Sequence, residues 1–122
     1  MKKILIVEDE RIVRNLVKKK LVAEGYEVEL AVDGKDGLEK IEEADPDLVL
    51  LDILMPRMNG IEFLEEIRKI EKFKKLPVII VSNSGQPVEI DKARKLGVEE
   101  WIVKTEFDPR EIIKKVNEQV GK

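Results

Sequence analysis

The chain has 122 residues, of which 43% are hydrophobic and 40% are charged, and its formal net charge at pH 7 is −3. This length suits one domain with one core, and the composition is typical of a soluble globular protein rather than a membrane protein. Cysteine and histidine are both absent, which excludes disulfide bonds, zinc sites built from either residue, a Ser-His-Asp triad and a phosphohistidine donor.

Neither a membrane anchor nor a nucleic-acid-binding surface is indicated. No apolar run approaches the roughly 20 residues of a membrane-spanning helix. The N-terminal apolar run, Ile4 to Val7, is too short for a signal peptide, and acidic residues follow it at once. Lysines and acidic residues are mixed along the chain without a basic stripe. We therefore expect a cytoplasmic protein that binds neither a membrane nor nucleic acid.

The first part of the chain alternates between strand and helix patterns. The apolar run KILIV (3–7) predicts a strand, and the apolar residues after it have helical spacing until Gly25 ends that helix. The segment YEVELAV (26–32) alternates at first, as an edge strand does. Asp33 begins a turn and helix cap, and the second helix ends before Pro46.

The same alternation continues through the second part of the chain. DLVLLD (47–52) and VIIV (78–81) are continuous apolar strands. The helix between them follows the turn signal Asn59-Gly60 and is marked by an apolar stripe that runs from Ile61 to Ile70. The fourth helix ends at Gly97, and EWIVK (100–104) is the last strand.

The last helix begins at DPRE (108–111), with Asp108 as the N-cap and Pro109 in the first turn. The pattern is thus five strands alternating with five helices. Strands that are apolar throughout need helices on both faces, which implies an α/β fold with a parallel sheet. Because the chain ends with this helix, we expect one domain over residues 1–122 and no output domain.

Polar residues follow four of the five predicted strands. Glu8 and Asp9 follow the first, Asp52 ends the third, Ser82 follows the fourth and Lys104 ends the fifth. Ligands of open parallel sheets bind outside the carboxyl ends of the strands, so these side chains are expected at one edge. They are the candidate functional residues.

Each of these residues also has an explanation without function. Acidic residues after a strand favour the N-terminus of the next helix, a serine there can be a turn residue, and a strand-end lysine is commonly solvated. Asp52 resists this explanation, because apolar residues flank it on both sides in LVLLDILMP (48–56). The combination is therefore interpreted as a site.

Three carboxylates held close together repel one another, and a divalent cation removes the repulsion. The charges of Mg²⁺ and Lys104 would balance those of Glu8, Asp9 and Asp52. Oxygen ligands favour Mg²⁺ or Ca²⁺, and a site with few protein ligands favours Mg²⁺ with a phosphate group. One carboxylate would then act as a nucleophile towards phosphorus, while Ser82 hydrogen-bonds the transferred group.

Four segments together resemble the response-regulator receiver domain of two-component signalling, in its stand-alone, chemotaxis-regulator-like form. They are ILIVEDE, LVLLDILMPRMNGIEFL, PVIIVSNSG and WIVK, and they occur in this order over nearly the whole chain. The resemblance implies a flavodoxin-like (βα)5 three-layer sandwich, with a five-stranded parallel sheet in the order 2-1-3-4-5.

The resemblance also implies a phosphoacceptor and a metal site. Asp52 would accept the phosphoryl group. The Mg²⁺ cofactor would be held by Asp9 directly, by Glu8 through water, by Asp52 and by the backbone carbonyl of Leu54. These roles are carried over position by position from the motifs VED and LLDIL.

Three further residues would respond to the phosphoryl group. Lys104 would contact it, Ser82 would move towards it as the switch hydroxyl, and Trp101 would turn inward as the switch aromatic. Trp101 is interpreted equally well as a part-buried aromatic of an edge strand. The sequence departs from the family pattern at Thr105, where proline is common, and at Asn83, where a smaller residue is usual.

The expected function is that of a signalling phosphoacceptor rather than an enzyme. The phosphohistidine of a sensor histidine kinase or histidine phosphotransfer protein would donate to Asp52. The acyl phosphate would shift a two-state equilibrium that a downstream protein reads on the face of the fourth helix, fifth strand and fifth helix. The chain would be a monomer or a phosphorylation-dependent dimer.

Other functions stay open at the level of the sequence. A receiver-fold scaffold or binding module, natural or engineered, would keep the fold without phosphorylation. A Mg²⁺-dependent phosphohydrolase would usually need a second acid near Asp52, and Ile53 and Leu54 supply none. Flavin binding is disfavoured because Glu8 and Asp9 would repel the flavin phosphate.

Overall fold

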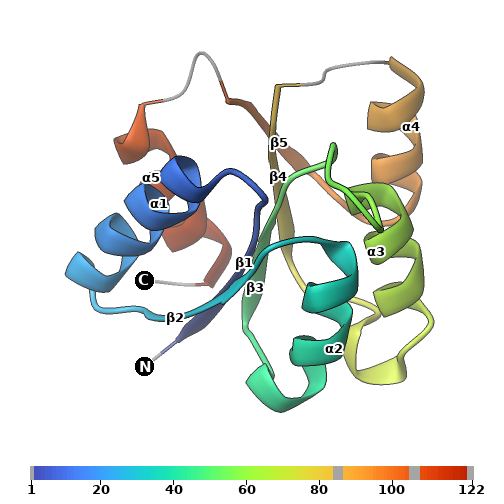
Figure 1. Ribbon diagram of the computed structural model, residues 1–122, viewed down its shortest axis with the longest axis horizontal. Helices are drawn as coiled ribbons and strands as arrows, with labels where there is room; N and C mark the ends of the chain where they lie inside the picture. The colour runs from blue at the N-terminus through green and yellow to red at the C-terminus, as the bar shows by residue number, and fades with distance from the viewer. Residues whose placement is uncertain (1, 84–86, 105–107, 121–122) are drawn as a thin grey trace.

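The computed structural model describes residues 2–83, 87–104 and 108–120. Thr105, which stands where proline is common in the family, lies outside these ranges, and with it the isomer of the Lys104–Thr105 peptide bond. Five strands and five α-helices alternate within the described residues (Figure 1). The strands are β1 (Lys3–Val7), β2 (Glu27–Ala31), β3 (Leu48–Leu51), β4 (Val78–Ser82) and β5 (Glu100–Val103). The helices are α1 (Arg11–Ala23), α2 (Gly34–Ala44), α3 (Gly60–Arg68), α4 (Pro87–Lys95) and α5 (Pro109–Val120).

The strands form one parallel sheet in the order β2-β1-β3-β4-β5. This confirms the fold class expected from the resemblance, including β2 as an edge strand. The register aligns Val7 with Leu51 and Ser82 with Val103. Because all strands are parallel, their carboxyl ends lie at one edge of the sheet, and the residues that follow β1, β3 and β5 meet there.

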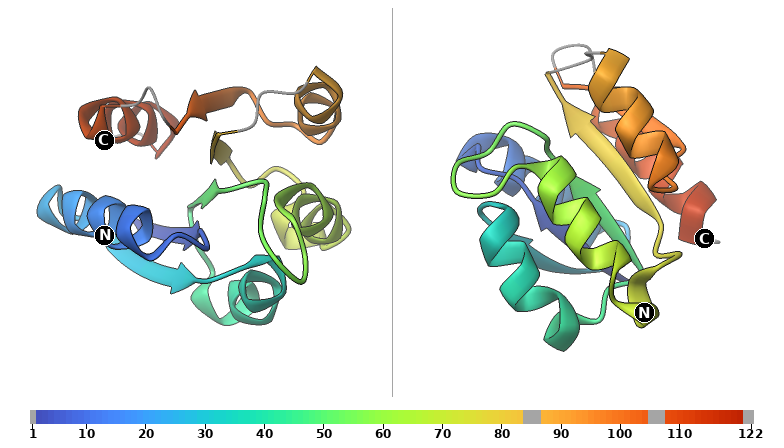
Figure 2. Two further views of the ribbon diagram at one scale, coloured as in Figure 1. Left: turned by 45° about the horizontal axis from the view of Figure 1, so that its top comes forward. Right: turned by 90° about the vertical axis from the view of Figure 1, so that its right-hand side faces the viewer.

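Helices cover both faces of the sheet, so the molecule has three layers. Helices α1 and α5 lie on one face, and α2, α3 and α4 lie on the other (Figures 1 and 2). Alternate residues of each central strand enter opposite cores, as Leu5 and Ile6 of β1 do. This explains why β1, β3 and β4 are apolar along their whole length.

Helix starts and ends follow the local signals of the sequence. Asp33 caps α2 by accepting a hydrogen bond from the Asp36 N–H at 2.8 Å, as the sequence predicts. Gly25 and Gly97 have φ angles of 94° and 87°, which suit glycine after a helix. Asn59, interpreted from sequence as a turn signal, forms a capping box with Glu62 at the start of α3.

The third helix is shorter than its apolar pattern suggests. It ends at Arg68, Ile70 has extended dihedral angles, and a short 3-10 helix, η1 (Glu71–Phe73), follows. The Arg68 side chain donates hydrogen bonds to the carbonyl oxygens of Phe73, Leu76 and Leu96. These bonds join the ends of α3 and α4 to the segment before β4. Among the described residues, no helix has the length and apolar character required to cross a membrane.

Candidate functional site

Glu8 and Asp52 are brought together by the pairing of β1 with β3. Each follows the last residue of its strand, and the Asp52 N–H donates to the Val7 carbonyl oxygen at 2.9 Å. The Ile53 N–H donates to Asp52 Oδ1 at 2.8 Å, which fixes one carboxylate oxygen. The edge of the sheet thus presents two neighbouring carboxylates.

Lys104 contacts these carboxylates from the end of β5, the edge strand opposite β2. Its N–H donates to the Ser82 carbonyl oxygen at 2.9 Å, which extends the pairing of β4 with β5 by one residue. Its Nζ lies 2.9 Å from Glu8 Oε2 and 3.1 Å from Asp52 Oδ2. All three side chains are buried, with exposures of 4–5%. A buried charge requires a partner, and the charges of this group partly compensate one another.

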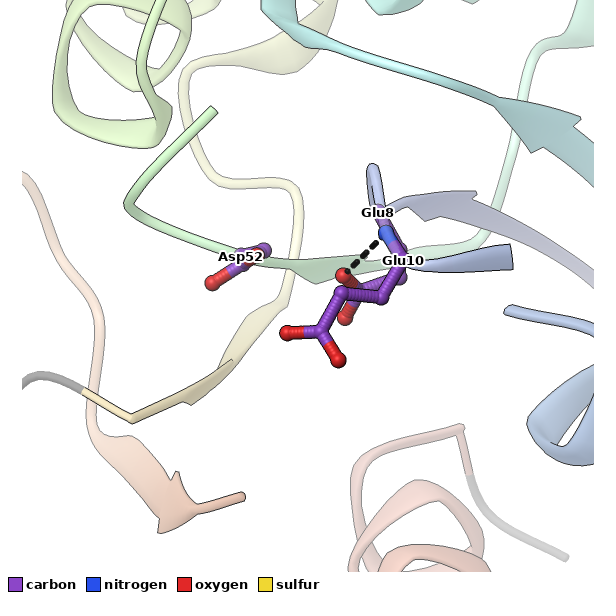
Figure 3. Close-up of side chains that lie close together, drawn as sticks. All are labelled: Glu8, Glu10 and Asp52. Atoms are coloured by element: carbon purple, nitrogen blue, oxygen red, sulfur yellow. Dashed lines mark hydrogen bonds between the residues drawn. The ribbon is translucent and has the colours of Figure 1, made fainter. Parts of the chain in front are cut away.

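Glu10 is a third carboxylate of the site that the sequence analysis does not include. Its Oε1 lies 2.8 Å from Lys104 Nζ, and its backbone N–H donates to Glu8 Oε2 at 3.0 Å. Figure 3 shows Glu10 beside Glu8, with Asp52 close to both. The only sequence signal was a third acid in VEDE, because the contact depends on how far the Glu10 side chain reaches in the folded chain.

The surroundings of the site shift the pKa values of two buried side chains, Glu8 and Lys104. Burial raises the pKa of Glu8 to about 7; the Lys104 contact opposes this rise, and the charge of Asp52 adds to it. For Lys104, burial disfavours the charged form, but hydrogen bonds to Glu10, Glu8 and Asp52 outweigh burial and raise its pKa. Lys104 is therefore positively charged at neutral pH, whereas Glu8 exchanges its proton near neutrality.

The acidic residues fit a hard divalent cation. One carboxylate oxygen each from Glu8, Glu10 and Asp52 lies within 4.8 Å of the others. With all three ionised, Lys104 leaves a surplus of two negative charges, which a divalent cation balances. Oxygen-only donors are the ligands that Mg²⁺ prefers. The chemistry of this donor set is therefore that of a magnesium site.

Asp9 lies beside this cluster without being one of its three members. Its side chain is exposed. Partial loss of hydration beside the cluster and the neighbouring Asp52 carboxyl group both raise the pKa of Asp9. Leu54 is 61% exposed on the loop after β3. The metal-ligand roles of Asp9 and of the Leu54 carbonyl stay predictions.

Ser82 and Trp101, the two residues with expected switch roles, lie on β4 and β5. Ser82 is the last residue of β4 and is fully buried. Trp101 of β5 is partly buried and packs against the core beneath α2, α3 and α4. A cavity of about 40 Å³ beside it is lined by residues of α4 and β5, among them Ile90 and Ala93. Both the switch interpretation and the edge-strand interpretation are compatible with this position.

Hydrogen bonds connect the loop between β3 and α3 to the start of α2. Arg57 donates to the buried Asp33 carboxylate at 2.7 and 3.1 Å. The Gly34 N–H donates to the Met58 carbonyl oxygen at 3.1 Å. Arg57 holds the pKa of Asp33 below its usual range. This clamp, which the sequence analysis missed, fixes the loop that begins at Asp52.

The family of the chain follows from comparison with known proteins. The model of the response regulator receiver domain matches residues 4–117. The chain belongs to this family. Receiver domains are signalling phosphoacceptors of two-component systems, and they bind Mg²⁺ at an acidic pocket. The cluster at the carboxyl ends of β1 and β3 corresponds to such a pocket.

Individual receiver proteins are similar over most of the chain. The chemotaxis protein CheY of Thermotoga maritima is 38% identical over 117 residues, which cover 95% of each chain. The regulator of RpoS of Escherichia coli is 43% identical over 84% of this chain, but the match covers only 30% of that protein.

Solved structures give the same result for the fold. A CheY-like receiver domain from Methanospirillum hungatei has a TM-score of 0.92 and 33% identity, covering 99% of this chain and 94% of its own. The chemotaxis protein CheY4 of Vibrio cholerae has a TM-score of 0.90 and 32% identity, with 98% of each chain covered. The fold is thus that of receiver domains.

Proposed function

We propose that the protein is the phosphoacceptor of a two-component phosphorelay and that Asp52 is the residue phosphorylated. The observation that carries this proposal is the buried contact of Asp52 with Lys104, beside Glu8. A carboxylate nucleophile, a fixed cation and an acidic metal pocket are the parts needed for phosphoryl transfer to an aspartate.

The chemistry follows from the positions of the two oxygens of Asp52. Oδ1 accepts the Ile53 N–H, and Oδ2 contacts Lys104. One oxygen forms a bond to phosphorus while the bond from phosphorus to the histidine nitrogen of the donor breaks, and the nitrogen keeps the electron pair. Lys104 then balances charge on the phosphoryl oxygens. Bound Mg²⁺ would neutralise the remaining negative charge.

Glu8, Glu10 and Asp52 would hold the cation by their clustered oxygens, with Asp9 as a further ligand. Four carboxylates close together are costly without a cation, and a bound cation lowers that cost. Phosphorylation is therefore proposed to depend on Mg²⁺.

The phosphoryl group is proposed to act through Ser82 and Trp101 on the face formed by α4, β5 and α5. A histidine kinase or phosphotransfer protein would be the donor, and a downstream protein would read this face. Support comes from the relatives, since receiver domains of this kind work with histidine kinases and downstream targets. The mechanism is a shift between two pre-existing states.

The test is the intact mass of the protein after incubation with acetyl phosphate, with and without Mg²⁺. The parent should gain one phosphoryl group only with Mg²⁺, and Asp52→Asn should gain none. Asn keeps the size of the side chain and removes the nucleophile, so it is the matched control. A folded parent that binds Mg²⁺ but gains no mass, even with a histidine kinase, would leave a receiver-fold scaffold as the function.

A further inference from the structure

Glu10 makes the shortest contact of Lys104 in the site. Its Oε1 lies 2.8 Å from Nζ, compared with 2.9 Å for Glu8 and 3.1 Å for Asp52. The Glu8 and Asp52 side chains are buried, whereas the Glu10 side chain is 50% exposed. Glu10 can therefore leave Lys104 and be solvated by water, which the two buried acids cannot do without moving the core.

The Glu10 side chain has no role in starting the helix beside it. Glu10 is the N-cap residue of α1, and its backbone carbonyl accepts the Arg14 N–H at 2.9 Å. Its side chain makes no capping hydrogen bond, although this position usually uses the side chain for that purpose. The carboxylate instead reaches back over the sheet edge to Lys104.

Lys104 has three N–H donors, and carboxylates accept all three. The acceptors are oxygens of Glu8, Glu10 and Asp52. An ammonium group has no further donor to offer. Phosphorylation of Asp52 replaces only the Asp52 contact, so a phosphoryl group that uses more than one Lys104 donor must displace Glu8 or Glu10, and Glu10 is the acceptor that solvent can reach.

We propose that Glu10 is a positioning residue that holds Lys104 in the unphosphorylated protein and competes for it with the phosphoryl group on Asp52. This inference rests on the proposed function. Glu10 would slow phosphorylation in two ways. It competes for Lys104, and its negative charge repels an anionic phosphodonor. The same charge would strengthen the binding of a cation in the pocket.

The reaction used for the test is phosphorylation by acetyl phosphate. An oxygen of Asp52 forms a bond to phosphorus, the bond from phosphorus to the acetate oxygen breaks, and acetate leaves with the electron pair. The phosphorylation rate is measured by intact mass at saturating Mg²⁺. The affinity for Mg²⁺ is measured separately by calorimetry on the unphosphorylated protein.

Two variants of Glu10 distinguish the effect of its contact with Lys104 from the effect of its negative charge. Glu10→Gln removes the charge, so the phosphorylation rate should rise about two- to fivefold, as expected when a half-exposed ion pair is lost, while the affinity for Mg²⁺ falls. Glu10→Asp keeps the charge but is one methylene shorter and loses its reach to Lys104. Its phosphorylation rate should also rise, while its affinity for Mg²⁺ falls less than that of Glu10→Gln because the charge is kept. Glu42→Gln, on the exposed side of α2, controls for net charge and should match the parent.

The outcomes distinguish this inference from the function on which it rests. If the parent is phosphorylated and neither Glu10 variant is phosphorylated faster, Glu10 does not slow phosphorylation and this inference is disproved, while the phosphoacceptor role stands. If Glu10→Gln is faster but Glu10→Asp equals the parent, charge alone acts and the proposed contact has no role. If the folded parent takes no phosphoryl group from acetyl phosphate or a kinase, the proposed function itself fails.

Discussion

At the scale of single residues, Lys104 is the side chain on which the buried charges of the site depend. Its ammonium group faces carboxylates of Glu8, Glu10 and Asp52, two of which are almost fully buried. A buried ion pair adds little to stability when compared with apolar residues, but removal of one partner is strongly destabilising. Loss of Lys104 leaves two buried carboxylates without a cation, whereas loss of one carboxylate leaves Lys104 paired with the other two.

Lys104→Met is expected to lower the free energy of unfolding by about 3 kcal/mol or more at pH 8 without Mg²⁺. Methionine keeps a similar shape, but Glu8 and Asp52 are left buried without a cation. Urea unfolding measures the effect, and adding Glu8→Gln to the variant should restore part of the loss.

The control is Lys115→Met, which removes a lysine whose Nζ lies 2.7 Å from Glu100 at a much more exposed site. It should cost less than about 1 kcal/mol. Equal losses for the two methionine variants would contradict the importance given to burial at Lys104.

The raised pKa of Glu8 predicts that the metal-free protein loses stability as pH rises. Between the ordinary value of 4.5 and about 7, the folded protein keeps a proton on Glu8 that the unfolded chain has released. The contribution of Glu8 is therefore complete below pH 4.5 and is lost as pH rises through about 7.

Thermal unfolding of the parent and Glu8→Gln, in parallel between pH 4.5 and pH 8, measures this effect. The melting temperature of the parent should fall relative to that of Glu8→Gln over this range. Mg²⁺ should reduce the difference at pH 8, since it binds the ionised carboxylate. Parallel curves for the two proteins would show that Glu8 titrates as it does in the unfolded chain.

At the scale of elements, the loop between β3 and α3 is held by backbone contacts that tolerate few side chains. A Cβ added at Gly60 would lie 2.1 Å from the Asp52 carbonyl oxygen and 2.9 Å from the Ile53 Cα. Both are backbone atoms, so the loop itself would have to move. The start of α3 is therefore packed directly onto the residue proposed as phosphoacceptor.

Gly60→Ala is expected to destabilise the protein by about 1–3 kcal/mol, the usual cost of overpacking. It should also slow phosphorylation of Asp52, because the displaced backbone carries that residue. Urea unfolding and the acetyl phosphate assay measure the two effects. The control is Glu65→Ala, at an exposed position of the same helix. It should change the free energy of unfolding by less than about 0.5 kcal/mol and the phosphorylation rate by no more than the corresponding factor.

Elements were predictable from the sequence where their signals are local. Apolar runs, helical stripes and Gly25 or Gly97 as helix ends identified the five strands and five α-helices of the described residues, but not the short 3-10 helix η1. The end of α3 was missed because Ile70 is apolar at the helical spacing, whereas the chain turns there to let Arg68 bind three carbonyl groups. Such a tertiary arrangement leaves no local pattern.

At the scale of the whole molecule, the parallel topology explains which site residues could be predicted. Glu8, Asp52 and Lys104 each stand at the carboxyl end of a strand, so the rule for open sheets brings them together. Glu10 and the Asp33–Arg57 clamp depend on side chains that cross between loops, which spacing along the chain does not reveal. A single domain over 1–122 and a cytoplasmic location stay predictions.

The site edge and the face of α4, β5 and α5 are joined through β4 and β5. Ser82 ends β4 and pairs with Val103, and Trp101 lies two residues earlier on β5. A phosphoryl group that draws Ser82 towards Asp52 would thus act directly on the strand that carries Trp101. The cavity beside Trp101, between β5 and α4, leaves the ring space for a small displacement.

Phosphorylation is expected to change the fluorescence of Trp101, the only tryptophan of the chain, because its ring would move within a partly apolar environment. The measurement is emission before and after addition of acetyl phosphate with Mg²⁺. Asp52→Asn should show no change. Ser82→Ala should still gain the phosphoryl group by mass but lose most of the fluorescence change, since the hydroxyl that couples the two sites is gone. A full change in Ser82→Ala would instead make Trp101 a passive edge-strand aromatic that senses the added charge alone.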